Sequence, residues 1–381
     1  MSGKRIVCAG HVCIDITPAV PDLKGTRIDE MLSPGKLVQV GRASLSVGGC
    51  VSNTGLGLKV LGANVSLMGK IGKDAFGELI LNEFRRYGAQ EGLIVSEEDA
   101  SSYTVVIAIP GIDRIFLHHP GANDTFRDSD IPWDKVKGAA LFHFGYPPIM
   151  RAFYENGEEE LLKTLTHARQ AGCATSLDLA MVDPDSDAGR QDWEKILTRA
   201  LPLVDFFCPS IEELCWMLDP ERFASWKERS AGGDVTAILD VDRDIRPLAK
   251  RCMELGCKVL LLKCGAPGMY LRTASKGVLD EISPAVGLDT ARWAEQDFFE
   301  KSYVPDRVLS GTGAGDTSIA AFLKAVLDGY DPQMTMHLAA GTGASCVEAY
   351  DTLSGLRSFE KLKEKIAAGW KKAGEGRPAA E

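Results

Sequence analysis

Apolar runs of strand length alternate along the chain with segments whose apolar residues recur at helical spacing. The strand-like runs are residues 5–16, 64–72, 173–180, 203–210 and 257–265. The helical segments are residues 51–63, 76–89, 160–172, 245–256 and 317–329. This alternation is typical of a mostly parallel central sheet with helices on both faces, so we predict a doubly wound α/β fold.

Two stretches depart from the alternation, because residues 37–47 and 101–123 have the pattern of antiparallel strands and a hairpin turn. We predict that they belong to a small antiparallel β lid, built from about 16–47 and 101–123, beside the main sheet. The polar segments 219–247 and 272–303 are interpreted as surface insertions. Residues 1–370 are predicted to form one domain, and residues 371–381 a frayed C-terminal tail.

Charge and cysteine content narrow the class of protein. The chain has 381 residues and a formal net charge of −10, so it lacks the excess of basic residues that nucleic-acid or anionic-membrane binding requires. No apolar run is long enough to cross a membrane, and the first one is too short and too polar for a signal peptide. The ten cysteines include no C-x-x-C pair. We therefore expect a cytoplasmic protein with reduced, buried thiols and no membrane or nucleic-acid partner.

The segment "LSGTGAGD" places three glycines and an alanine before Asp316 and a strongly apolar helix. These glycines have a purely structural explanation, since they let the chain turn into a helix whose first turn favours an acidic residue. The same geometry also exposes successive backbone amides, which can hold an anion beside the carboxylate. The spacing is neither that of a dinucleotide-binding G-x-G-x-x-G nor that of a P-loop.

A second glycine cluster lies near the N-terminus. Gly48 and Gly49 precede a helix that carries Asn53, and Asp15 leaves the first strand. Glycines let a substrate approach the backbone closely, and an amide or a carboxylate can bind hydroxyl groups. Each of these residues could equally be a turn glycine or a helix cap.

Together the two clusters resemble the glycine-rich N-terminal and D-T-x-G-A-G-D C-terminal signatures of the ribokinase-like (PfkB) carbohydrate kinase family. The resemblance extends from about Ile6 to Phe359 and implies an ATP-dependent phosphotransferase acting on a sugar hydroxyl, expected to be primary. It implies that Asp316 is the catalytic base. The implied anion-hole residues are Gly313, Ala314 and Gly315, with Thr312 on the ATP side, and the implied substrate-binding residues are Asp15, Gly48, Gly49 and Asn53.

Further positions follow from the resemblance. "CPSIEEL" is similar to the family's N-x-x-E segment, with Ser210 at the Asn position and Glu213 as the residue expected to contact Mg²⁺ through water. "LLKCGAPGMYL" is similar to the strand-turn-strand that lines ATP, which places Lys263, Gly265 and Gly268 at the nucleotide. Residues 342–346 fall where the adenine-side helix is expected.

One departure concerns Ser310, which stands where the family usually has an aspartate linked to a monovalent-cation site. The resemblance also implies a homodimer formed through the lids. Two alternatives stay open. The chain could be a nucleoside kinase of the same superfamily, with Tyr103, Phe116 or Tyr146 stacking on a base, or a catalytically silent regulatory protein that binds a ligand.

Overall fold

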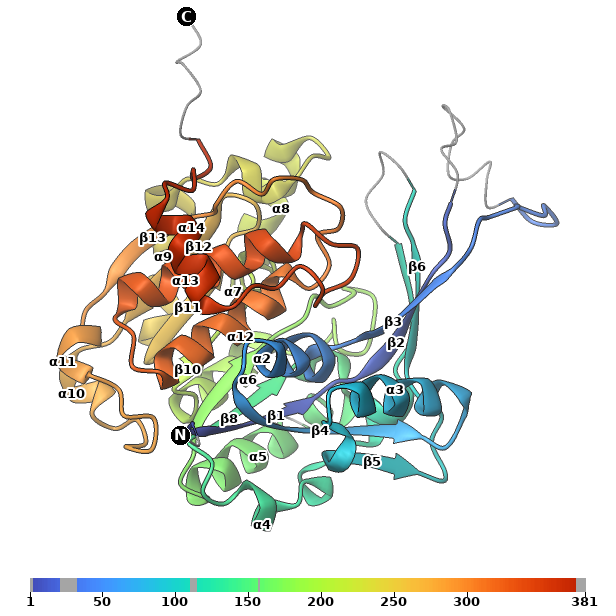
Figure 1. The fold of residues 1–381 in the computed structure, drawn as a ribbon, viewed down its shortest axis with the longest axis horizontal. Helices are drawn as coiled ribbons and strands as arrows, with labels where there is room; N and C mark the ends of the chain where they lie inside the picture. The colour runs from blue at the N-terminus through green and yellow to red at the C-terminus, as the bar shows by residue number, and fades with distance from the viewer. Residues whose placement is uncertain (1–2, 21–32, 110–114, 157, 375–381) are drawn as a thin grey trace, which may run out of the picture.

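A computed structural model of the chain describes residues 3–20, 33–109, 115–156 and 158–374. These residues form two sheets, with helices packed around the larger one (Figure 1). The larger sheet has the strand order β13-β12-β11-β10-β9-β8-β1-β4-β5. Its strands are β1 (Arg5–Gly10), β4 (Asn64–Gly72), β5 (Leu93–Ser96), β8 (Leu141–Gly145), β9 (Ala174–Asp178), β10 (Phe206–Phe207), β11 (Val259–Lys263), β12 (Gly268–Thr273) and β13 (Asp297–Lys301). In this order every pair of neighbouring strands from β5 to β11 is parallel, whereas β12 pairs antiparallel with both β11 and β13. The sheet is therefore mostly parallel, as predicted.

Helices cover both faces of this sheet, as predicted. They are α2 (Gly57–Val60), α3 (Ala75–Arg86), α4 (Trp133–Val136), α5 (Glu159–Gln170), α6 (Trp193–Ala200), α7 (Ile211–Leu218), α8 (Pro220–Ser230), α9 (Arg246–Glu254), α10 (Lys276–Leu279), α11 (Thr290–Trp293), α12 (Ala314–Leu327), α13 (Pro332–Cys346) and α14 (Phe359–Ala367). The π-helix η1 (Val51–Leu56) leads into α2. Alternate side chains of β1 show the two faces, because Ile6 and Cys8 pack into one core and Val7 and Ala9 into the other.

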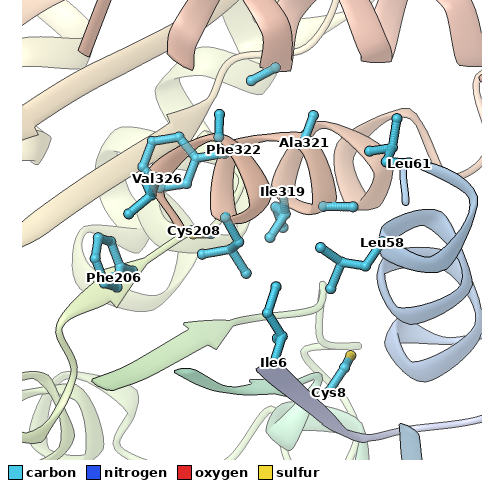
Figure 2. Packing of buried hydrophobic residues seen from close by; sticks show 14 of the residues in the cluster. Ile6, Cys8, Leu58, Leu61, Phe206, Cys208, Ile319, Ala321, Phe322 and Val326 are labelled. Carbon is cyan, nitrogen blue, oxygen red and sulfur yellow. The ribbon is translucent and has the colours of Figure 1, made fainter. Parts of the chain in front are cut away.

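Helix α12 is buried along almost its whole length against the sheet. Ile319, Phe322 and Val326 point toward the strands (Figure 2), and the Phe322 ring meets the Phe206 ring of β10 edge-on at 6.3 Å. The apolar spacing that predicted this helix therefore corresponds to a real buried face. The packing holds the first turn of α12, which carries Asp316, in one position relative to the sheet.

The smaller sheet is the predicted lid, and its strands project from one side of the body (Figure 1). Its order is β3-β2-β6-β7, with β2 (Cys13–Thr17), β3 (Ser44–Gly48), β6 (Tyr103–Ile107) and β7 (Ile115–His119). The β2–β3 and β6–β7 pairs are antiparallel, whereas β2 and β6 run parallel. The strand predicted at 37–47 is shorter and later than expected, since β3 spans only residues 44–48. The parts of the predicted lid at 21–32 and 110–114 lie outside the described residues.

The prediction of one continuous strand over residues 5–16 is wrong. Gly10 has φ of +130°, and a β-carbon there would lie 2.3 Å from the carbonyl oxygen of Gly145. The chain therefore leaves the main sheet at this glycine and enters the lid as β2. Asp15 consequently belongs to a lid strand rather than to the end of the first central strand.

The two polar segments are also not surface insertions. Residues 272–303 contain α10, α11 and β13, the edge strand of the main sheet. Residues 219–247 contain α8, whose Phe223 and Trp226 are buried in the second core. The indole of Trp226 donates a hydrogen bond to Asp244 at 3.1 Å, which joins two parts of this segment to each other.

Backbone hydrogen bonds to the body continue beyond residue 371, where the predicted frayed tail begins. The amide of Val304 bonds to the carbonyl of Lys371, and the amide of Ala373 bonds to that of Ser302. Residues 375–381 lie outside the described part of the chain. The ten cysteines are free and buried, as expected, and no helix in the described ranges is long and apolar enough to cross a membrane.

Candidate active site

The glycine-rich turn before α12 brings Asp316 to the edge of the sheet. Gly313 has φ of +75°, and a β-carbon there would lie 2.2 Å from Thr352 Cγ2, so only glycine fits this turn. The turn leads directly into Ala314, the first residue of the helix. The predicted anion-hole residues therefore lie at the positive end of a buried helix, where backbone amides favour an anion.

The Asp316 carboxylate is buried and accepts three side-chain hydrogen bonds. Asn53 Nδ2 donates to Oδ2 at 3.2 Å, and Thr54 Oγ1 donates to Oδ1 at 3.2 Å. The Tyr146 hydroxyl also donates to Oδ1, at 2.7 Å. Asn53 and Thr54 come from the π-helix η1, an irregular helical geometry that is frequent at functional sites.

A lysine and two acidic residues lie beside this carboxylate. Lys263 and Asp178 are at the carboxyl ends of β11 and β9, which flank β10, and Glu213 is on α7. Lys263 ends β11 and forms an ion pair of 2.8 Å with Asp178, which ends β9. Burial opposes the charge on Lys263, but the carboxylates of Asp178 and Glu213 outweigh it and raise the pKa of its ammonium group. This edge of an open α/β sheet is where ligands bind in such folds.

Ser210 and Glu213 form a reciprocal cap at the start of α7. The Ser210 hydroxyl accepts a hydrogen bond from the amide of Glu213 at 3.2 Å, and Glu213 Oε2 accepts one from the amide of Ser210 at 2.8 Å. The segment "SIEE" thus accounts for the positions of Ser210 and Glu213 by local helix capping. The cap also fixes the Glu213 carboxylate close to Lys263 and Asp178.

These groups surround a cavity of about 250 Å³. Its lining includes Tyr146, Asp178, Ser210, Glu213, Lys263, Gly265, Gly315 and Asp316. Asp178 Oδ2 is buried without a hydrogen-bond partner among the described residues. An unpaired carboxylate oxygen and a second carboxylate fit a hydrated Mg²⁺, which is usually bound through one or two carboxylates plus substrate phosphates.

A second cavity, of about 430 Å³, continues from the first turn of α12 along the end of β11. It is lined by Lys263, Gly265, Gly268, Ala314 and Gly315, all of which were predicted near ATP or its phosphates. Gly343 and Ala344, within the predicted adenine-side segment 342–346, also line it. Thr312 does not, and its amide instead donates to the hydroxyl of Ser310 at 3.2 Å.

A third cavity, of about 760 Å³, lies under the lid on the other side of Asp316. Asp15, Gly49 and Asn53, which were predicted to bind the acceptor, line it. Gly48 does not line it, but a β-carbon there would lie 2.4 Å from Asp15 Oδ2, so this glycine makes room for the Asp15 carboxylate. Phe116 and Tyr146 also belong to its wall.

A sequence model of the pfkB family carbohydrate kinases matches residues 4–358. The chain belongs to this family. It is therefore a carbohydrate kinase, as the resemblance implied. A 2-dehydro-3-deoxygluconokinase of Bacillus subtilis is 23% identical over 339 residues, which cover 88% of this chain and 90% of that one.

Solved structures show the same fold. A fructokinase with bound ATP from Xylella fastidiosa has a TM-score of 0.68 at 18% identity, over 96% of this chain and 99% of that one. A nucleoside kinase from Methanocaldococcus jannaschii has a TM-score of 0.65 at 20% identity, with the same shares covered. The ribokinase-like fold is thus established, and it accommodates both sugar and nucleoside kinases.

Several residues of this kinase's site were not found from the sequence. Asp178, Thr54 and His11 belong to no recognised signature, and Tyr146 was considered only as a stacking residue. A lone aspartate in the apolar run "CATSLDLA" was an available signal for Asp178. His11 lines the acceptor cavity, and neither ring nitrogen has a hydrogen-bond partner in the described part of the chain. Burial and the neighbouring His118 lower the pKa of His11, which keeps the ring neutral.

Proposed function

We propose that this carbohydrate kinase transfers the γ-phosphate of ATP to a hydroxyl, expected to be primary, of a sugar or sugar derivative. The observation that carries the proposal is the place of Asp316 between two cavities. Gly315, its neighbour, lines the 430 Å³ cavity, while Asn53 and Tyr146, its hydrogen-bond partners, line the 760 Å³ cavity. A base at this point can take the proton from an acceptor hydroxyl as the oxygen attacks phosphorus.

The first turn of α12 supports the role of Gly313, Ala314 and Gly315 as an anion hole. Their amides offset the negative charge that develops on the transferred phosphoryl group. Lys263, held by Asp178, contributes a fixed positive charge on the same side. ATP lies along Gly265 and Gly268, with Thr312 and Ser210 at its margins.

Mg²⁺ fits the acidic side of the small cavity, where Glu213 would hold it through water and Asp178 Oδ2 would supply a second oxygen. When bound, the ion neutralises phosphate charge and orients the γ-phosphate. Asp15, Gly48, Gly49 and Asn53 form the acceptor side, where the lid excludes water that would otherwise hydrolyse ATP.

The test is ADP release by the purified full-length protein with ATP and Mg²⁺, across a panel of neutral sugars, sugar acids and nucleosides. Turnover with a sugar supports the proposal. Turnover confined to nucleosides favours the nucleoside kinase, since the fold alone accommodates both. ATP binding without turnover on any acceptor favours the regulatory alternative.

We also infer that residues 1–370 act as one kinase unit in the cytoplasm. Leu45, Phe116 and Leu117 are exposed apolar side chains on the lid strands, which supports pairing of two lids in a homodimer. Sedimentation of the wild type against a Leu45→Lys/Leu117→Lys variant tests this. A monomeric wild type would exclude the dimer.

A further inference from the structure

Tyr146 stands between the acceptor cavity and the small cavity, since its side chain lines both. Its hydroxyl donates a hydrogen bond of 2.7 Å to Asp316 Oδ1. Burial and the nearby Asp316 carboxylate raise the pKa of Tyr146 well above its usual value, so the hydroxyl stays protonated and remains a donor. Its ring lies 6.1 Å from the ring of His11, measured between centroids. In this structure the Tyr146 side chain therefore acts as a hydrogen-bond donor to the Asp316 carboxylate.

The backbone at Tyr146 is held in an unfavourable conformation. Its φ of 69° and ψ of 37° lie in the left-handed region, which is rare for a bulky side chain. The residue follows β8 and precedes Pro147 and Pro148, and its amide bonds to the carbonyl of Asp178 at 3.3 Å. Strain of this kind persists where the surrounding structure enforces it, and it concentrates at active sites.

The hydrogen bonds to Asp316 divide unequally between its two oxygens. Among the described residues, Oδ1 accepts from both Thr54 and Tyr146, whereas Oδ2 accepts only from Asn53. A carboxylate has about four lone-pair sites, two on each oxygen. Oδ1 is therefore fully used, and Oδ2 keeps one site for a further donor.

We propose that Tyr146 is a positioning residue that, together with Thr54, fixes Oδ1 of Asp316 and presents Oδ2 to the acceptor hydroxyl. This inference rests on the proposed function. The acceptor proton passes to Oδ2 as the acceptor oxygen bonds to the γ-phosphorus. The bond from that phosphorus to the bridging oxygen breaks, and its electron pair leaves with ADP.

The test is Tyr146→Phe in the full-length kinase, assayed with the best acceptor of the panel. Hydrogen bonds to charged groups are worth enough that kcat should fall roughly 10- to 100-fold. The KM for ATP should change little, because Tyr146 does not line the 430 Å³ cavity. The loss should fall on kcat and leave the acceptor KM within a few-fold, because Tyr146 acts on the carboxylate rather than on the acceptor. A merely structural role would not produce this split between kcat and KM.

Two further variants sharpen the result. Tyr330→Phe is the matched control, because its hydroxyl also contacts a charged group, Lys363 at 3.0 Å, but lines none of the three cavities. It should leave the kinetics unchanged. Thr54→Val removes the other donor to Oδ1. The double variant Thr54→Val/Tyr146→Phe should be non-additive on a logarithmic scale, since both residues act on one oxygen.

Wild-type kcat in Tyr146→Phe would overturn the inference, and so would a change confined to the acceptor KM. Asp316→Asn, measured beside it, separates this failure from that of the proposed function. If Asp316→Asn is inactive while Tyr146→Phe is normal, only the positioning role is lost. If Asp316→Asn is active, the base itself is wrongly assigned.

Discussion

The two ends of the site, which we propose bind the phosphates and the acceptor, are built in different ways. At the phosphate end, Lys263 and Asp178 sit on the ends of central strands and are joined by a buried ion pair. At the acceptor end, a large part of the wall comes from the lid, where Asp15 and Phe116 lie on strands β2 and β7. Apolar residues such as Leu117 are exposed on that lid. The strands of the first end pack into the two hydrophobic cores, whereas the second end depends on the four-stranded lid sheet.

The difference assigns chemistry and specificity to separate parts of the molecule. Groups on rigid elements keep the geometry that phosphoryl transfer requires. The acceptor cavity instead contains polar groups that have no hydrogen-bond partner among the described residues, such as the imidazole of His11. Buried polar groups left unpaired without the right substrate discriminate strongly against analogues that lack the matching hydroxyl.

The largest effect is expected at the border between the two ends. Asp316→Asn keeps the size of the side chain but removes the base, so kcat should fall roughly 10²–10⁴-fold. ATP affinity, measured by calorimetry, should stay within a few-fold if the phosphate end is built independently. Near wild-type turnover would refute the base, whereas loss of ATP binding with an intact fold would show that Asp316 is mainly a nucleotide residue.

A smaller effect is expected within the lid. Asp15→Ala should lower kcat/KM for the acceptor roughly 10- to 100-fold, as for loss of a hydrogen bond to a charged group. ATP binding should survive, because Asp15 lines only the acceptor cavity of the three. The measurement is steady-state kinetics with each substrate varied in turn. Unchanged acceptor kinetics would remove Asp15 from the site.

The same contrast explains what the sequence could predict. The proposed phosphate end is encoded by short contiguous segments, so the signatures predicted roles for Gly313, Gly315, Asp316, Lys263 and Glu213. Tyr146, Asp178 and Thr54 come from three separate segments that only the fold brings together. A single sequence carries no signal that these segments lie together in the fold, and the same is true of the segment that carries His11.

The fold was predictable where the apolar patterns are strong. Helix α12 and strand β11 have continuous apolar faces and were placed correctly. Strand β13 was missed because it is an edge strand with exposed positions, so its pattern resembles a polar loop. The break between β1 and β2 was missed because the apolar run continues through Gly10, and the close approach of Gly10 to Gly145 exists only in the folded chain.

A modest effect of pH on stability should arise in the central layer, in addition to that of the buried His11 in the 760 Å³ cavity. His143 on β8 is fully buried, and this burial lowers its pKa to about 3. An unfolded histidine titrates near 6.5. As the pH falls from about 6.5 toward about 3, the unfolded chain binds a proton that the folded chain does not, so stability should fall.

Urea unfolding of the wild type and of His143→Gln across this pH range measures the contribution. The variant loses a 2.9 Å contact with Ser176, so its stability should be lower at neutral pH. Its decline below pH about 6.5 should nevertheless be shallower, because one of the linked protons is gone. Parallel declines would mean that His143 does not govern the acid sensitivity of the layer.

The smallest effect is expected for potassium, at the loop that joins β13 to α12. Ser310 replaces the acid of the family's cation site, which removes a charge that a monovalent ion would require. The loop is held instead by internal contacts. The amide of Leu309 bonds to the carbonyl of Val347 at 2.8 Å, and Glu348 accepts the amide of Asp306 at 2.9 Å. Arg357 pairs with the same glutamate at 2.5 Å, so a fixed guanidinium already lies beside the loop.

We therefore expect kcat and the KM for ATP to change little when potassium is exchanged for a bulky organic cation at constant ionic strength. Strong activation by potassium would show that other ligands complete the cation site, and that the phosphate end depends on an ion as well as on its own packing.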